Sequence, residues 1–108
     1  MIKMKKNLSE NGNSKVYANI FRLYITGASP NSARAITNLK KIFERYLKGQ
    51  YELNVIDVYQ HPQIVAKVNI VALPLLVRTM PLPERRLIGD MSDGEKVLKS
   101  LGLSNQTE

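Results

Sequence analysis

The sequence predicts an α/β fold with the element order β-α-β-α-β-β-α, and three observations lead to that prediction. Residues 19–26 and 51–58 have the apolar patterns of strands, and a long amphipathic helical pattern separates them. The longest apolar run, residues 70–77, suits a buried strand and is shorter than the ~18 residues that a membrane span needs. At 108 residues, with 44% hydrophobic content, the chain is expected to form one globular domain.

The first half of the pattern is the clearer one. Phe21, Leu23 and Ile25 alternate onto one face of the first strand, and Ser29 can cap a helix that begins at Pro30. The helix is expected to end near Gly49. The second strand, residues 51–58, should pair parallel to the first because a single helix connects the two.

The second half has shorter segments and more prolines. Residues 61–69 are expected to form a short helix with Ile64, Val65 and Val68 on its apolar side. Residues 70–78 form a strand in which Pro74 should lie at an edge, a strand start or a bulge, because proline cannot donate to a ladder. Several pairings are close in energy here, so the prediction is less determined than in the first half.

Two further elements complete the chain. Residues 85–89 predict a short strand that ends at a glycine. Residues 92–95, Ser-Asp-Gly-Glu, have the spacing of a capping box, so a last helix should begin there and stop near Gly102. The resulting order, with a proline at the start of the third strand, is the thioredoxin architecture. The residues expected in its core are Phe21, Leu23, Ile25, Ile36, Leu39, Phe43, Leu53, Val55 and Ile56.

The amino-acid composition excludes several classes of function. The chain has no cysteine, so disulfides, thiol catalysis and cysteine metal sites are excluded, and His61 is the single histidine. The net charge of +7 predicts an acidic partner, but no nucleic-acid motif accompanies it. Residues 1–18 are expected to be a disordered basic leader, 19–102 the domain and 103–108 a polar tail. We expect a cytoplasmic protein without cofactor or metal.

The turn after the first strand, Ala28-Ser29-Pro30-Asn31, occupies the place where thioredoxins carry their redox cysteines. Thiol chemistry is excluded without a cysteine. Ser29 or Ser32 would need an adjacent base to act as a nucleophile, and no carboxylate is placed by sequence to orient His61. We therefore interpret the turn as a structural helix cap, with anion binding at the helix N-terminus as the alternative.

Three stretches resemble the KaiB family over about residues 19–101: "TGASPNS" at the turn, "VIDV…HPQ" after the second strand and "PLPERRLIGD" after the third. The resemblance implies a non-enzymatic regulator that binds the KaiC ATPase. It also implies a protein with two folds: a thioredoxin-like monomer that binds KaiC, and an oligomeric ground state, a dimer or tetramer, of the order β-α-β-β-α-α-β. The ground state is the form that we expect in a crystal.

The resemblance also assigns residues. It implies partner contacts at Arg34, Asn54 and Lys67. Its fold-switch positions are Ser100 and Gly102. The X–Pro bonds at Pro74, Pro81 and Pro83 isomerise slowly, so a fold change that flips one or more of them would gate binding.

The chain departs from the clock proteins at several positions. It has Asn54 in place of a basic residue, Asn69 in place of a lysine, and no long acidic tail. These departures favour stress adaptation beside a KaiC homologue over circadian timing. The alternative is a thioredoxin-like sensor or adaptor related to the KaiB-like domain of the clock-output histidine kinase SasA.

Overall fold

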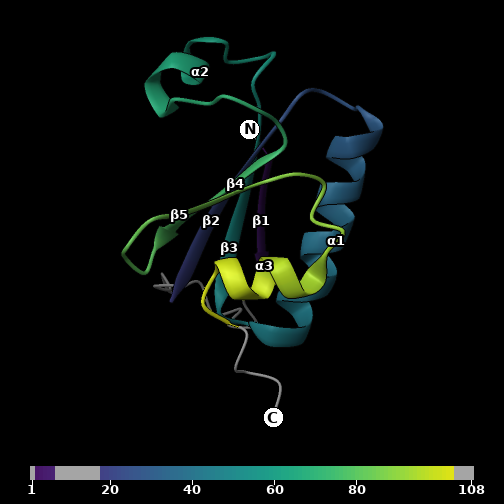
Figure 1. The fold of residues 1–108 in the computed structure, drawn as a ribbon, viewed down its shortest axis with the longest axis vertical. Coiled ribbons are helices and arrows are strands. Elements are labelled where there is room, and N and C mark those ends of the chain that lie inside the picture. The colour runs from purple at the N-terminus through teal and green to yellow at the C-terminus, as the bar shows by residue number, and fades with distance from the viewer. Residues whose placement is uncertain (1, 7–17, 104–108) are drawn as a thin grey trace, which may run out of the picture.

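The computed structural model describes residues 2–6 and 18–103. From residue 19 onward it has the thioredoxin-like order β-α-β-α-β-β-α that the sequence predicts, and one additional strand precedes it. The elements are β1 (Ile2–Lys6), β2 (Asn19–Ile25), α1 (Pro30–Tyr46), β3 (Tyr51–Asp57), α2 (Gln63–Val68), β4 (Leu75–Met80), β5 (Arg85–Ile88) and α3 (Gly94–Ser100). The strands form one sheet of order β1-β3-β2-β4-β5. As expected, β2 and β3 are parallel and joined by α1, while β4 and β5 follow as antiparallel strands (Figure 1).

The expected disordered leader is wrong for Ile2–Lys6, which forms β1 and pairs antiparallel with β3. An open strand edge presents unpaired N–H and C=O groups, and pairing with a neighbouring segment satisfies them. The rest of the leader that we expected before residue 18 lies outside the described residues. The polar tail begins later than expected, because Leu103 packs against the core and its N–H donates to the Leu98 carbonyl at 2.7 Å.

One face of the sheet carries the main core. Helices α1 and α3 pack on it, and Phe21 stacks on Phe43 with ring centroids 4.2 Å apart. Of the nine predicted core residues, eight are buried, and Ile36 is half-buried at the margin. Ile56 belongs to the smaller cluster on the opposite face.

The opposite face is only partly covered. Helix α2 is short and lies at the end of the molecule remote from α3 (Figure 1). Its Ile64 and Val68 pack on a cluster formed by Tyr24, Ile56 and neighbouring strand residues. Val65, expected on the same apolar side, is exposed instead, because a helix of this length presents only one narrow side to the sheet. Among the described residues, no helix covers the remainder of this face.

Most of the predicted starts and ends of helices and strands are confirmed. Ser29 caps α1, with Pro30 in its first turn, and Gly49 follows the helix end with φ +76°. Pro74 directly precedes β4, which matches the expected strand start. The cap of α3 is Asp93 and not Ser92 as the capping-box spacing predicted, because the Asp93 side chain accepts from the Lys96 N–H at 3.1 Å.

A buried arginine ties the last segments together. Arg78, on β4, donates to the Leu101 carbonyl at 2.7 Å and to the Pro83 carbonyl at 3.0 Å. Burial, and then the proximity of Arg85, lower the pKa of Arg78. The guanidinium therefore anchors both the end of α3 and the turn between β4 and β5.

Candidate functional site

The turn between β2 and α1 is held by a network of capping hydrogen bonds. Ser29 Oγ accepts from the Ser32 N–H at 3.1 Å and donates to Ser32 Oγ at 2.8 Å, and Ser32 Oγ accepts from the Thr26 N–H at 3.3 Å. Asp57 accepts from the Gly27 N–H at 3.0 Å. Each serine hydroxyl is therefore engaged with the backbone of its own turn.

The surroundings of this turn offer little for catalysis. In the described part of the chain, no hydrogen bond joins the His61 side chain to either serine. A depression of about 440 Å³ beside the turn has Asp57 as the one ionisable group among its lining residues. That carboxylate also accepts from the Tyr59 N–H at 2.9 Å, so it serves as a backbone anchor. The interpretation of the turn as a structural cap agrees with this geometry.

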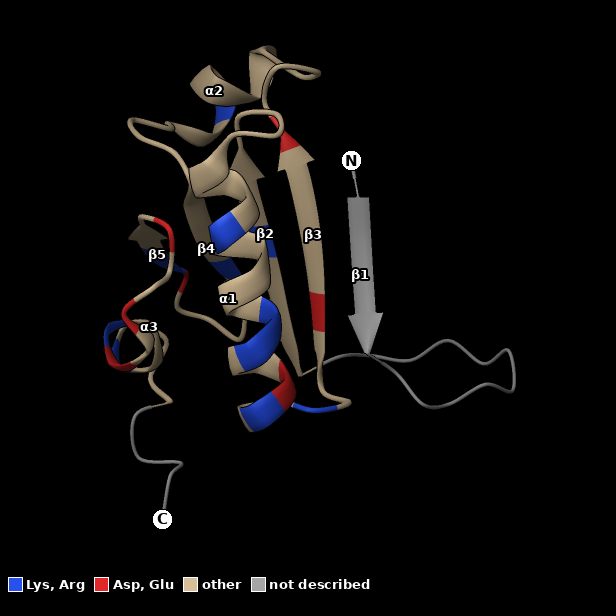
Figure 2. Ribbon diagram, turned by 90° about the vertical axis from the view of Figure 1, so that its right-hand side faces the viewer, with Lys and Arg blue, Asp and Glu red and all other residues tan. Residues whose placement is uncertain are grey.

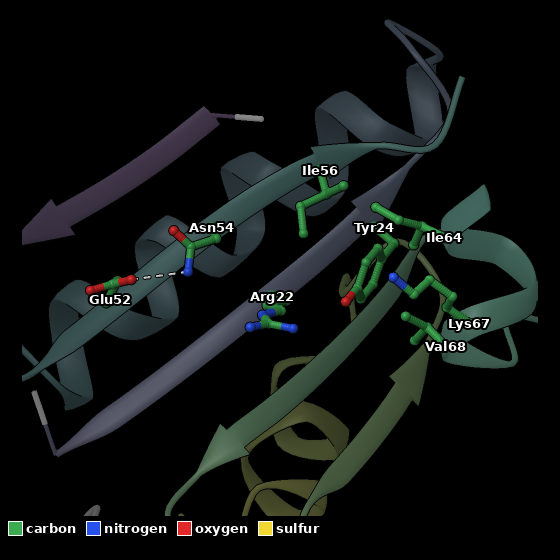
Figure 3. Close-up of a pocket in the computed structure, with 8 residues that line it drawn as sticks. All are labelled: Arg22, Tyr24, Glu52, Asn54, Ile56, Ile64, Lys67 and Val68. Carbon is green, nitrogen blue, oxygen red and sulfur yellow. Dashed lines mark hydrogen bonds between the residues drawn. The ribbon is translucent and has the colours of Figure 1, made fainter. Parts of the chain in front are cut away.

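A groove lies on the half of the sheet that α2 leaves open. It has a volume of about 500 Å³, with a floor from β2 and β3 and one wall from α2 (Figure 3). The residues that line it are Arg22, Tyr24, Glu52, Asn54, Ile56, Ile64, Lys67 and Val68. Alternation along the strands places every second side chain on this face, opposite the main core.

The groove brings together two of the three predicted contact residues. Asn54 forms part of the floor and is 7% exposed, and Lys67 is an exposed residue of α2. Asn54 Nδ2 donates to Glu52 Oε2 at 3.0 Å, and Asn54 Oδ1 is buried without a hydrogen-bond partner among the described residues.

The third predicted contact residue, Arg34, lies elsewhere. It is on α1, and its Nε is 3.2 Å from Asp90 Oδ2, in the segment before α3. Its guanidinium also donates to Asn31 Oδ1, and the side chain of Asn38 donates to the Asp90 carbonyl at 2.9 Å. Hydrogen bonds from Ser92, and then the Arg34 guanidinium, hold the pKa of Asp90 below its ordinary value. Arg34 thus joins α1 to the segment that precedes α3, which we call the α3 corner.

The remaining basic residues of α1 line its outer surface in a separate group (Figure 2). Lys40, Lys41 and Arg45 are exposed on that helix. They lie on the α1 side of the sheet and contribute nothing to the groove.

Comparison with known proteins identifies the family. Residues 22–103 match the KaiB domain. The circadian clock oscillator protein KaiB of Synechococcus elongatus is 50% identical over 84 residues, which cover 78% of this chain and 82% of the relative. The chain belongs to the KaiB family. The corresponding protein of Prochlorococcus marinus is also 50% identical, with 78% of each chain covered. These relationships support a regulatory role related to the circadian clock.

Solved structures agree with the fold of this KaiB-family chain. The N-terminal domain of SasA from Synechococcus elongatus matches with a TM-score of 0.68 and 22% identity, covering 89% of this chain and 91% of that one. Chloroplastic thioredoxin z matches with a TM-score of 0.64 and 16% identity, covering 80% and 78%. The chain therefore has the thioredoxin-like fold.

The predicted fold-switch positions of this KaiB-family chain lie in two places. Pro74 is buried before β4, while Pro81 and Pro83 are exposed in the turn between β4 and β5. All three follow cis peptide bonds. Ser100 ends α3, and Gly102 follows it with φ +74°. Their role in a fold change is untested and stays a prediction.

Sequence reasoning missed several residues of the KaiB-family groove. Arg22 and Tyr24 alternate with the core residues of β2, and Arg22 is the register partner of Asn54 on β3. The sequence did offer one signal for this site, because Arg22 is a cation in the middle of a strand, on the face opposite the core residues. Within the described residues, no cluster of acidic, histidine or cysteine side chains could hold a metal ion, and no helix combines the length and apolarity needed to span a membrane.

Proposed function

We propose that this KaiB-family chain is a non-enzymatic regulatory protein that binds a KaiC-like ATPase through the groove beside α2. The observation that carries the proposal is the groove itself, where Asn54 and Lys67, predicted from family resemblance alone, line one surface. The opening turn supports a binding role over catalysis, because the hydroxyls of Ser29 and Ser32 are engaged in capping.

The biological setting that we propose is stress adaptation, not circadian timing. The support is the set of departures from the clock proteins, among them Asn54 and Asn69 in place of basic residues. We also propose that the free protein self-associates in its ground state and binds its partner as a monomer in a cytoplasmic setting. Light scattering on the free protein and on its mixture with the ATPase would test this. A complex whose mass shows that the protein binds as its intact oligomer would contradict the proposal.

The binding experiment mixes the purified protein with the KaiC-like ATPase encoded in the same genome and measures association by biolayer interferometry. Lys67→Glu should weaken association because it reverses an exposed charge at the groove wall. Lys41→Glu, an equal charge change on the outer surface of α1, is the matched control. Association should also weaken as salt rises, since exposed charges are screened beyond about 8 Å at physiological ionic strength.

Two results would contradict the proposal. One is the absence of any complex with the ATPase; the other is a complex that Lys67→Glu and Lys41→Glu affect equally. The non-enzymatic character has its own assay, in which disulfide reductase, glutathione transferase and nucleotidase turnover should stay at background. Turnover that survives repurification and disappears on Ser29→Ala would assign the turn a catalytic role.

A further inference from the structure

Three donor groups in the groove have no acceptor among the described residues. They are the Arg22 guanidinium, the Tyr24 hydroxyl and the Lys67 ammonium, all of which belong to residues that line the same groove. Within the described part of the chain, none of the three takes part in a hydrogen bond or an ion pair of its side chain. Figure 3 shows Arg22 and Tyr24 following one another along β2, with Lys67 reaching from α2 toward Tyr24.

Of these three donors, Tyr24 is held by the surrounding structure, whereas Arg22 and Lys67 belong to exposed residues. Tyr24 is only 2% exposed, so its ring position is set by the packing of the smaller cluster. Residues 22 and 24 are two apart on one strand and therefore share a face. The carboxylate of Glu52, at the far end of the groove, accepts from Asn54 along its own strand. The groove thus has Lys67 and Tyr24 at its α2 end and Arg22 next to them in its middle, across from Asn54 (Figure 3).

The same end of the groove is apolar next to the donors. Ile56 is buried in the floor, and Ile64 and Val68 are half-buried in the wall. A free inorganic anion would satisfy the donors but would leave this apolar surface in water. A nucleic-acid backbone would bring phosphates at regular spacing, whereas the groove offers two cations on one short surface and an acidic residue beyond them.

We infer that the groove recognises an acidic segment of the partner protein, in which an Asp or Glu side chain stands next to an aliphatic residue. The carboxylate lies between Arg22, Tyr24 and Lys67, and the aliphatic side chain packs on Ile56 and Val68. A charge-assisted contact supplies orientation, and the apolar contact removes water around it. This inference rests on the proposed function and specifies the chemistry of its binding surface.

A peptide titration tests the recognition directly, without the ATPase. Backbone amide shifts are followed by NMR while acetyl-Gly-Leu-Glu-Leu-Glu-Gly-amide is added, and then with the peptide in which both Glu are Gln. The acidic peptide should shift the amides of β2, β3 and α2, and the Gln peptide should bind about tenfold more weakly. Equal binding of the two peptides, or shifts confined to the outer surface of α1, would overturn the inference.

Inorganic phosphate at the same ionic strength separates a segment site from a simple anion site. Phosphate that shifts the groove amides as strongly as the acidic peptide would also overturn the inference, because the apolar half would then contribute nothing. The variants Arg22→Gln and Tyr24→Phe should each weaken the acidic peptide by about three- to tenfold. Lys41→Gln on α1 should leave its affinity unchanged.

The same variants, tested for binding to the ATPase, distinguish a failure of the acidic-segment inference from a failure of the proposed function. Wild-type protein that binds the ATPase while Arg22→Gln and Tyr24→Phe bind it equally well would refute the acidic-segment inference and leave the proposed function standing. Binding of the acidic peptide with no binding of the ATPase would refute the proposed function, while the groove keeps its chemical preference.

Discussion

Replacement of Leu39 by alanine tests whether α1 is packed on the sheet as described. The Leu39 side chain is fully buried and lies in the core between α1 and the central strands. Removal of three carbon groups from such a site costs about 2.4 kcal/mol in lost transfer free energy at about 0.8 kcal/mol for each group. The cavity that remains adds to this, so the free energy of unfolding should fall by about 3–5 kcal/mol.

That loss is large compared with the whole stability of a small domain, which is about 5–15 kcal/mol. Each 1 kcal/mol shifts the thermal midpoint of a domain of this size by about 4–8 °C, so the midpoint should fall by at least about 12 °C. Circular dichroism during thermal and urea unfolding measures the change, and an unchanged urea m-value shows that the same surface still unfolds.

Ile36→Ala is the matched control, because it removes the same number of carbon atoms from the same helix. Ile36 is half-buried, so its variant should lose roughly half as much free energy of unfolding. A thermal midpoint unchanged by Leu39→Ala, or a larger loss for Ile36→Ala, would refute the packing of α1 on this face.

The remaining predictions concern the corner of the molecule around α3. Arg78→Ala should cost about 2–4 kcal/mol, because it leaves the Leu101 and Pro83 carbonyls without their donor; amide hydrogen exchange should rise first in α3, and even exchange across the sheet would contradict this. Hydrogen bonds from Ser92, and then Arg34, lower the pKa of Asp90, so the stability that its carboxylate contributes should be fully present above about pH 5 and should disappear as the pH falls below about 4. The difference in thermal midpoint between wild type and Asp90→Asn should shrink as the pH falls through that range, and a constant difference would contradict the lowered pKa. Arg34→Gln and Asp90→Asn should weaken partner binding equally if Arg34 acts by holding the segment before α3 through Asp90. A larger effect of Arg34→Gln would indicate that Arg34 contacts the partner directly. The double variant Ser100→Gly and Gly102→Asp should depopulate the thioredoxin-like form, because it removes a helix former and forces a side chain to φ +74° at a cost of about 1 kcal/mol; NMR spectra with an unchanged helix signal over residues 94–100 would contradict the prediction.

The elements of the first half were predictable because their signals are local. Ser29 and Pro30 mark the start of α1, and the alternation of Phe21, Leu23 and Ile25 marks the core side of β2. A single helical crossover made the parallel pairing of β2 and β3 predictable. Composition alone was enough to exclude thiol chemistry at the turn, because the chain has no cysteine.

The candidate site depended on contacts that no local pattern records. Arg34, Asn54 and Lys67 looked equivalent in the sequence as polar positions. Packing gives Arg34 a partner in Asp90 and places Asn54 and Lys67 on one groove. The cap of α3 is Asp93 and not the neighbouring Ser92, because two adjacent residues that can both cap are not distinguished by the sequence spacing.

By itself, the sequence predicted the element order from β2 onward, most of the residues that are buried in that half of the chain, and the resemblance to the KaiB family. The tertiary structure decided which face of the sheet stays open, that β1 pairs with the edge of β3, and that Arg22 and Tyr24 join Lys67 at one surface. The physical reason is the range of the interactions. Capping and alternation act within a few residues of the chain, whereas the groove requires donors from β2 and α2, which are separated by α1 and β3 in the sequence.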